Sequence, residues 1–252
     1  MPSPTPQRSA LVTGGGSGIG YAVAELLASQ GWSVAIAGRS MRKLEQAALD
    51  IHAEIGADGT PIIPIAADQG DSEAIKRMID QAVSKFGRLD ALVNNAGSAK
   101  VLAIGSNPLD IIQQTYAVNA IGPAHAIELA WPIFKRQGAG CVVNVGSYAA
   151  LDPFPGFFVY AGTKAAMNLM AASCAKEGAA IGVRAFCVAP GAVETELLRS
   201  AFDESVVAKE QCLRPREVGQ VILECILGTR DAQNGKTIYV KREGRGVHEL
   251  VV

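Results

Sequence analysis

The segment TGGGSGIG at residues 13–20 joins a short apolar run at 8–13 to a stretch of helical period at 18–30. Glycines in a strand-to-helix turn let backbone N–H groups approach a pyrophosphate, and the helix N-terminus adds partial positive charge. The spacing is Gly-x-x-x-Gly-x-Gly, so Ile19 stands where the Gly-x-Gly-x-x-Gly fingerprint, counted from Gly14, has its last glycine. The turn therefore predicts a dinucleotide phosphate site, and a plain tight turn is the alternative.

Around this turn, short apolar runs alternate with stretches of helical period, which is typical of repeated βα units. The pattern predicts an α/β fold of the Rossmann type, a doubly wound parallel sheet of about seven strands with helices on both faces. Residues 8–252 are expected to form one domain after a disordered leader at 1–7. The expected strands are 8–13, 33–38, 61–66, 89–94, 140–146, 182–189 and 236–240, and the expected helices are 18–30, 41–55, 71–86, 109–135, 158–180 and 215–227.

Composition narrows the classes of partner. The chain has 252 residues, 49% of them hydrophobic, and a net charge of −1, so it offers no basic stripe for nucleic acid. It has no run of about 18 apolar residues that would suit a membrane span. Five cysteines without ligand spacing indicate free thiols in the cytoplasm, and the three histidines show no metal-ligand spacing. We therefore expect a cytoplasmic protein without membrane, nucleic-acid or metal partners.

The end of the second expected strand bears on cofactor choice. A carboxylate there accepts hydrogen bonds from the ribose 2′-hydroxyl of NAD, whereas an arginine accommodates the 2′-phosphate of NADP. This chain has Gly38, Arg39 and Ser40 at that place. The sequence favours NADP(H), with a merely solvated Arg39 as the alternative.

A tyrosine and a lysine lie four residues apart in YAGTK at 160–164, so Tyr160 and Lys164 share one helix face. Such a pair is common on protein surfaces and is weak evidence by itself. Ser147, however, ends the fifth expected strand, where its hydroxyl emerges at the carboxyl edge of the sheet. The three side chains are candidates for one site.

These segments resemble the short-chain dehydrogenase/reductase family over nearly the whole chain, from about residue 9 to 240. The landmarks occur in the family's order, with its thirteen-residue interval between Ser147 and Tyr160. They are TGGGSGIG at 13–20, Asp68, NNAG at 94–97, Asn119 in YAVNAIG, VNVGS at 143–147, YAGTK at 160–164 and PGAVET at 190–195.

The resemblance implies roles for individual residues. Asn119 could instead cap or kink a helix, and Asp68 could be a turn residue. The implied catalytic residues are Ser147, Tyr160, Lys164 and Asn119. The implied cofactor-binding residues are Thr13, Gly14, Gly16, Ser17, Gly18, Ile19, Gly20, Arg39, Ser40, Asp68, Gln69, Asn95, Ala96, Gly97, Tyr160, Lys164, Pro190, Gly191, Val193 and Thr195.

The chemistry explains these residue types. Reduction of a carbonyl needs a proton at oxygen, which Tyr160 would donate, and the Lys164 cation is expected to lower the pKa of the phenol. Ser147 would stabilise negative charge on the oxygen, and Asn119 resembles the family residue that completes a proton relay to the lysine. We expect an NADP(H)-dependent reductase of a ketone, aldehyde or 3-oxoacyl group. The alternative is a non-catalytic NADP(H)-binding sensor or scaffold of the same fold.

Three segments leave substrate and assembly open. Residues 196–214 are expected to form a substrate lid. Residues 151–158 could wall a hydrophobic pocket, pack in the core or contact another subunit, and 241–252 read as a charged tail. The helical stretches at 109–135 and 158–180 carry apolar residues on more than one face, which favours a homodimer or homotetramer.

Overall fold

The computed structural model describes residues 7–56, 60–244 and 246–252. Most of the expected leader lies outside this range, but Gln7 is described, and its Nε2 donates a hydrogen bond of 3.0 Å to the carbonyl of Gly31. The described strands form one sheet in the order β3-β2-β1-β4-β5-β6-β7-β8. Their bounds are β1 Ser9–Thr13, β2 Ser33–Gly38, β3 Ile62–Ala66, β4 Ala91–Asn94, β5 Gly140–Val145, β6 Val183–Pro190, β7 Thr237–Glu243 and β8 Gly246–Val251.

The central strands are buried on both faces, as their continuous apolar runs predict. In β1 every residue is buried, and Val12 lies between Ile36 of β2 and Val93 of β4. The strand order reverses at β1, because β2 lies on one side of it and β4 on the other. Ligands of doubly wound sheets bind at such a reversal, so the fold places a binding crevice beyond Thr13.

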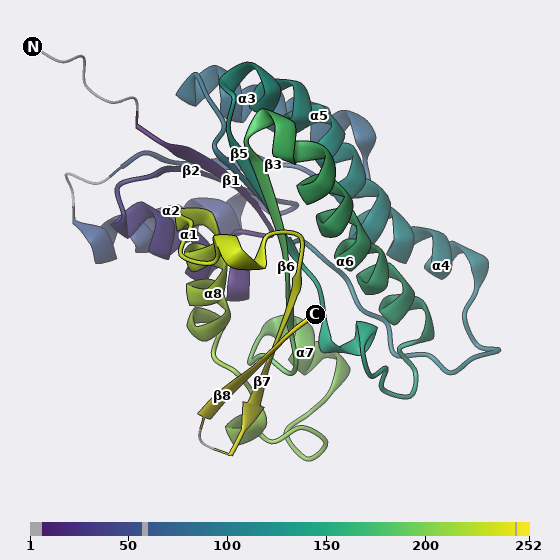
Figure 1. The fold of residues 1–252 in the computed structure, drawn as a ribbon. Coiled ribbons are helices and arrows are strands. Elements are labelled where there is room, and N and C mark those ends of the chain that lie inside the picture. The colour runs from purple at the N-terminus through teal and green to yellow at the C-terminus, as the bar shows by residue number, and fades with distance from the viewer. Residues whose placement is uncertain (1–6, 57–59, 245) are drawn as a thin grey trace, which may run out of the picture.

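Helices cover both faces of the sheet (Figure 1). One layer holds α1, α2 and α8, and the other holds α3, α4, α5 and α6, each packed on its own apolar cluster. Their bounds are α1 Gly18–Ser29, α2 Met41–Ile55, α3 Ser72–Phe86, α4 Leu109–Tyr116, α5 Gly122–Gln137, α6 Phe158–Gly178 and α8 Pro215–Leu227, with a short α7 at Glu196–Ala201. Short 3₁₀ turns follow at Tyr148–Ala150, Ala179–Ile181, Lys209–Gln211 and Asp231–Gln233. The α/β fold with helices on both sides is confirmed.

The single helix expected at 109–135 is interrupted. A π-helical turn, η1 at Ala117–Ile121, separates α4 from α5, and the Gly122 N–H donates to the carbonyl of Ala117. Pro123 has no N–H to offer the carbonyl of Asn119 four residues earlier, so regular α-helical bonding fails at this point. The interruption falls on a residue that the sequence marks as a site candidate.

The expected charged tail contains an eighth strand. β8 pairs antiparallel with β7, from Ile238 opposite Val251 to Glu243 opposite Gly246. All of its residues are exposed, and Arg230 binds Glu249 at 2.7 Å. Exposure on both faces explains why a hydrophobic pattern did not reveal this edge strand. Within the described ranges, no helix is long and apolar enough to cross a membrane.

Candidate functional site

The glycine turn needs glycine at several positions and leaves the first N–H groups of α1 unbonded. Gly14 and Gly18 have φ angles of +66° and +56°, which side chains other than glycine rarely adopt. A Cβ on Gly20 would lie 2.3 Å from the carbonyl oxygen of Gly14, so only glycine fits there. Ser17 stands at the N-cap of α1, but its side chain accepts no N–H from the helix. The first N–H groups of α1 therefore remain available to an anion such as a phosphate.

Two of the candidates fix the turn to β4. The hydroxyl of Thr13 accepts hydrogen bonds of 3.0 Å from the backbone N–H groups of Asn95 and Ala96. The side chain of Asn95 donates to the carbonyls of Thr13, at 2.8 Å, and Gly14, at 3.3 Å. These bonds join the ends of β1 and β4, where the strand order reverses. Thr13 thus holds the start of the glycine turn against the loop after β4. Gly20 lies directly against the backbone of Gly14.

A cavity of about 510 Å³ runs from the glycine turn to the end of β5. Its lining suits the nicotinamide half of a dinucleotide. The glycine turn, which can bind phosphate, lies at one end, and hydroxyl and ammonium groups lie at the other. The predicted residues that line it are Gly14, Ser17, Gly18, Ile19, Asn95, Ala96, Gly97, Ser147, Tyr160, Lys164, Pro190, Gly191, Val193 and Thr195.

Ser147, Tyr160 and Lys164 lie in this one cavity. Ser147 follows β5 and caps the turn at 148–150, where its Oγ accepts from the Ala149 N–H at 3.2 Å. Tyr160 and Lys164 come from the first turns of α6. The Lys164 Nζ lies 5.7 Å from the centre of the Tyr160 ring and donates a hydrogen bond of 2.8 Å to the carbonyl of Val145.

The expected net lowering of the Tyr160 pKa is wrong for this state of the chain, because burial outweighs any opposing effect. Burial raises the pKa of Tyr160, and only the hydrogen bond with Ser147 opposes that shift. Burial also lowers the pKa of Lys164, to about 8. The physical reason is that both groups are desolvated and that the ammonium is directed to a backbone carbonyl and not to the phenol oxygen.

Asn119 is fully buried in the π-helical turn. Its Oδ1 accepts from the Ser98 N–H at 2.8 Å, and its Nδ2 donates to the Ser98 carbonyl at 2.8 Å and to the Thr163 hydroxyl at 3.2 Å. A Cβ on Gly97 would lie 3.4 Å from Asn119 Oδ1 and 3.5 Å from Lys164 Nζ. Asn119 therefore joins the loop after β4 to α6 on the same side of Gly97 as the lysine.

The residues expected around the adenosine end lie outside the large cavity. Arg39 and Ser40 are exposed after β2, and the Ser40 hydroxyl accepts from the Lys43 N–H at the start of α2. Asp68 accepts from the Gly70 N–H at 2.8 Å, as a turn residue does. Gln69 is buried, and its Nε2 has no hydrogen-bond partner within the described chain.

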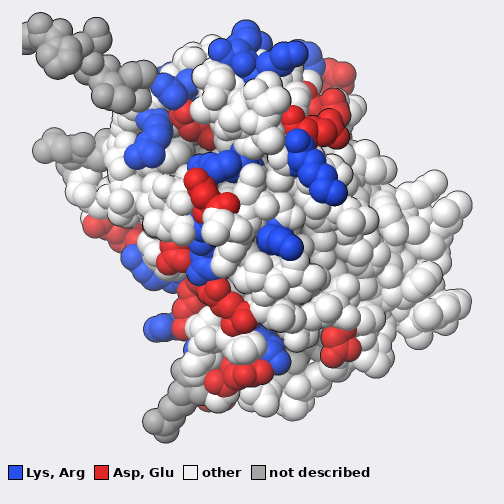
Figure 2. Space-filling model, in the orientation of Figure 1, with Lys and Arg blue, Asp and Glu red and all other residues white. Residues whose placement is uncertain are grey.

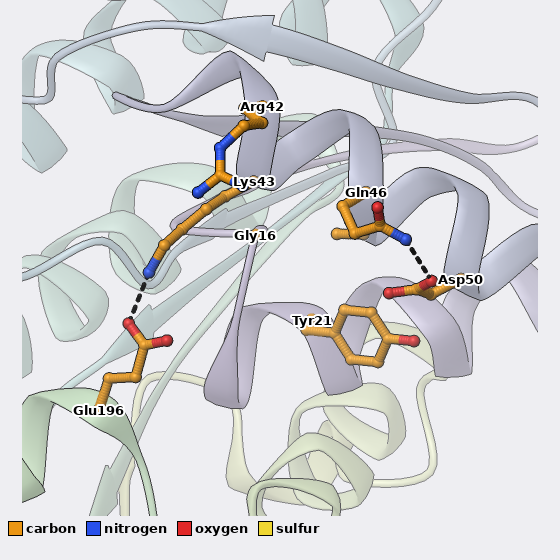
Figure 3. Close-up of a pocket in the computed structure, with 8 residues that line it drawn as sticks. Gly16, Tyr21, Arg42, Lys43, Gln46, Asp50 and Glu196 are labelled. Atoms are coloured by element: carbon orange, nitrogen blue, oxygen red, sulfur yellow. Dashed lines mark hydrogen bonds and ion pairs between the residues drawn. The ribbon is translucent and has the colours of Figure 1, made fainter.

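A second cavity, of about 270 Å³, lies on the outer side of Gly16 (Figure 3). In it Lys43 of α2 reaches across Gly16 to Glu196 of α7, with a contact of 2.7 Å, while Arg42 points down beside Lys43. Glu196 lines both cavities. Arg42 and Lys43 thus place two cations beside the glycine turn, at the start of the helix that follows Arg39 and Ser40 in the chain, and the sequence alone did not reveal this grouping.

Sequence reasoning named the two segments at the substrate end of the large cavity, 151–158 as one of three alternatives and 196–214 as a lid, but not the individual residues that line it. Residues 151–158 do wall it, since Asp152, Phe154 and Phe157 are among the lining residues. The expected lid contributes α7, and it is tied down by Arg199, whose Nε donates to Glu194 at 2.8 Å. The remaining lining residues from this end are Ala99, Tyr148, Ala149, Leu197, Leu198, Ala201, Phe202 and Val207. Only the aromatic composition of 151–158 signalled such a wall.

Comparisons with known proteins agree with this geometry. The family model for the short chain dehydrogenase matches residues 8–205. A short chain dehydrogenase of Pseudocercospora fijiensis is 37% identical over 206 residues, which cover 81% of this chain and 65% of that protein.

Two solved structures are similar along nearly their whole length. A 3-ketoacyl-(acyl-carrier-protein) reductase from Brucella melitensis, complexed with NADH, is 26% identical with a TM-score of 0.85 and covers 95% of this chain and 98% of that one. A short chain dehydrogenase from Burkholderia cenocepacia J2315, in complex with NADP, is 27% identical with a TM-score of 0.84 and covers 96% and 99%. With the family model matched across most of its length and the dinucleotide crevice in place, the chain belongs to the short-chain dehydrogenase family of nicotinamide-dependent oxidoreductases.

Proposed function

We propose that this protein is an NADP(H)-dependent reductase of a ketone, aldehyde or 3-oxoacyl group, or the corresponding alcohol dehydrogenase in reverse. One observation carries the proposal: Ser147, Tyr160 and Lys164 line the same cavity as the glycine turn. The cofactor supplies the hydride when it is bound. The residues of the chain supply the proton, the orientation of the carbonyl and the electrostatic environment.

Tyr160 holds the proton that the substrate oxygen receives. Its raised pKa means that the phenol is protonated near neutrality, which is the state a proton donor requires. Ser147, hydrogen-bonded to Tyr160, donates to the same substrate oxygen and stabilises the charge that develops on it. After transfer, the nearby Lys164 ammonium stabilises the tyrosinate.

Asn119 is proposed as part of the path that returns a proton to Lys164. Its amide faces Gly97 from the same side as the ammonium, and Pro123 leaves its carbonyl without the usual helical partner. Those two features support a relay through water between Asn119 and Lys164. The side-chain bonds to Ser98 and Thr163 keep this turn in place.

The proposed preference for NADP(H) rests on cations. Arg39 makes no ion pair among the described residues, and Arg42 and Lys43, which follow it at the start of α2, line the cavity beside Gly16. No carboxylate ends β2, so the ribose 2′-hydroxyl has no acidic acceptor there. The solved relatives include one complex with NADP and one with NADH, so the choice is this chain's own and must be measured.

Assembly and location are also proposals. α4 and α6 pack against each other. Leu109 of α4, Ile121 of the π-helical turn η1 and Leu169 of α6 are each more than 60% exposed. Figure 2 shows few charged side chains on the part of the surface above these helices. We propose that a second copy covers this face in a dimer or tetramer. The five free, buried cysteines support a cytoplasmic location.

The test is NADPH oxidation, followed by absorbance, over a panel of ketones, aldehydes and 3-oxoacyl thioesters. Turnover of at least one carbonyl, faster with NADPH than with NADH, is the expected result. Tight NADPH binding without turnover of any carbonyl would favour the sensor alternative. Failure to bind either nicotinamide cofactor would contradict the proposed function itself.

A further inference from the structure

Three phenylalanines from separate segments form one cluster at the substrate end of the large cavity. Phe154 and Phe157 belong to the loop before α6, and Phe202 directly follows α7 as its C-cap residue. The Phe202 ring meets those of Phe154 and Phe157 edge to face, with centres 5.5 and 5.7 Å away. All three line the cavity. The cluster therefore forms an aromatic wall that joins the loop to the lid.

The aromatic wall reaches the proposed proton donor. The centres of the Phe157 and Tyr160 rings are 5.0 Å apart, and both rings face the cavity. A carbonyl whose oxygen lies within hydrogen-bond reach of Tyr160 can therefore place a substituent against the adjacent Phe157 ring. A substituent in van der Waals contact with Phe157 and Phe202 gains most if it is itself a flat ring, since ring pairs in offset or edge-to-face contact are favourable beyond the area they bury.

The charged groups that line the cavity disfavour an anionic substrate. They are Asp152, Glu196 and Lys164. Lys164 is buried and donates to the Val145 carbonyl, whereas the two carboxylates are exposed. Arg199 lies nearby in α7 but is paired with Glu194. Glu196 is paired with Lys43 beside Gly16, so a carboxylate or a phosphate near the phenylalanines meets Asp152 as the acidic group. Among the described residues that line the cavity, Lys164 is the one cation, and it already donates to Val145.

Size sets a further limit. The volume of about 510 Å³ includes the part of the cavity beside the glycine turn, so the substrate has only a fraction of it. The lid side chains Leu197, Leu198, Ala201 and Val207 make that fraction apolar. A compact, uncharged molecule fits these conditions better than a thioester on a phosphate-bearing carrier.

We infer that the substrate class is an uncharged aryl or cyclic ketone, selected by Phe157 and Phe202 and guarded against anions by Asp152. This inference rests on the proposed reductase function and names its substrate. It separates this chain from the 3-oxoacyl thioester specificity carried by the name of one solved relative. Phe157, Phe202 and Asp152 are thus assigned as specificity-determining residues.

Four related substrates test both elements of the inference. Ethyl benzoylformate carries a phenyl group on the ketone where ethyl pyruvate carries a methyl group. Benzoylformate and pyruvate are the corresponding free carboxylates, which are anionic. With NADPH saturating, kcat/KM should be highest for ethyl benzoylformate, by about 10-fold over ethyl pyruvate, as burial of a ring against aromatic neighbours predicts. The aryl ketone is the less electrophilic of the two, so intrinsic reactivity works against this outcome. Acetoacetyl-CoA, added as a phosphate-bearing thioester, should be a poor substrate.

Variants assign the preference to residues. Phe202→Leu and Phe157→Leu should each reduce the ratio of kcat/KM between the two esters toward one. Phe158→Leu is the matched control, because Phe158 is 58% exposed and does not line the cavity. Asp152→Asn should raise kcat/KM for benzoylformate several-fold relative to its ester, whereas Asp110→Asn on α4, away from the cavity, should not.

The outcomes distinguish failure of the substrate inference from failure of the proposed reductase function. If the wild-type protein reduces ethyl pyruvate or acetoacetyl-CoA at least as well as ethyl benzoylformate, the inference is overturned while the proposed reductase function stands. If NADPH binds but none of the carbonyls is reduced, both fail. The wild-type comparison decides the matter even where a phenylalanine variant does not fold, and thermal unfolding identifies such a variant.

Discussion

Lys43 and Glu196 form an ion pair of 2.7 Å that links the start of α2 to the start of α7 past Gly16 (Figure 3). Both side chains are at least half exposed, so the pair itself adds little stability. The pair lies beside Gly16, and Lys43 follows Arg39 by four residues in the chain, which gives the pair another consequence. If NADP(H) places a 2′-phosphate near Arg39, the Lys43 ammonium is shared between that phosphate and Glu196.

Glu196→Gln should therefore strengthen NADPH binding. Removing the competing carboxylate frees Lys43, and an exposed pair of this kind is worth about 1.5- to 5-fold in affinity. NADH, which lacks the 2′-phosphate, should bind as it does to the wild type. Fluorescence titration of both cofactors at low and high salt measures this. An equal change for NADH and NADPH would show that Glu196 acts through the lid and not through Lys43.

Cofactor choice itself should depend on Arg39. Substituting Arg39→Asp, or Gly38→Asp together with Arg39→Ala, should weaken NADPH binding and shift preference toward NADH. Loss of one charge-assisted phosphate contact predicts a decrease in affinity of about 10- to 150-fold. Dissociation constants for the two cofactors, compared between wild type and variants, test the assignment. A wild-type protein that binds NADH more tightly than NADPH would contradict it.

Burial of Lys164 predicts a pH dependence of stability. Its pKa falls from 10.5 to about 8 on folding, so between these pH values the unfolded chain holds the proton that the folded chain has released. The contribution of Lys164 to the free energy of unfolding must then rise with pH in that window, by about 3 kcal/mol at most. Urea unfolding of wild type and Lys164→Met at about pH 7 and about pH 10 isolates this contribution. The buried cysteines, whose pKa values are raised, lower the stability of both proteins as pH rises. The difference in unfolding free energy, wild type minus variant, should therefore grow from about pH 7 to about pH 10, and a constant difference would refute the shift.

The apolar face of α4 and α6 should form a subunit contact. Leu169 is 72% exposed near the middle of α6, where a charge would be buried against a second copy. Leu169→Glu should lower the mass measured by light scattering at micromolar concentration. Leu49→Glu on α2, with 64% exposure, is the matched control and should leave the mass unchanged. A monomeric wild type would exclude the proposed assembly.

Most of the fold follows from periodicity in the sequence. The helix at 41–55 and the helix at 215–227 begin and end as expected, because each has one apolar stripe and a glycine beyond its end. The π-helical turn around Asn119 was not predicted, although Pro123, which removes an N–H from the helical bonding there, is visible in the sequence. β8 was hidden because an exposed edge strand has no buried face to produce a pattern.

The candidate site divides in the same way. The glycine turn and the Ser147, Tyr160 and Lys164 set could be predicted, since strand ends and helix spacing fix where such residues emerge. The partners of those groups could not. That Lys164 bonds Val145, and that Phe202 closes on Phe157 across 45 residues of sequence, depends on packing in three dimensions. The wrong direction expected for the pKa of Tyr160 has the same origin, because desolvation is a property of the folded environment.

The central claim is that Tyr160 donates the proton while Ser147 and Lys164 act with it. Ser147→Ala should reduce turnover by about 10²- to 10³-fold through lost stabilisation of the oxygen, and the double variant with Tyr160→Phe should fall far short of the product of the single effects. Lys164→Ala should also weaken NADPH binding if Lys164 contacts the cofactor.

The most direct measurement compares Tyr160→Phe with the wild type for NADPH affinity and for single-turnover reduction of a confirmed carbonyl substrate. The substitution removes one hydroxyl, so NADPH should bind nearly as tightly, while the reduction rate should fall by about 10²- to 10⁴-fold as expected for loss of a general acid. Tyr116→Phe, at an exposed phenol outside the cavity, should keep the wild-type rate. A Tyr160→Phe protein that reduces the substrate as fast as the wild type would contradict the account.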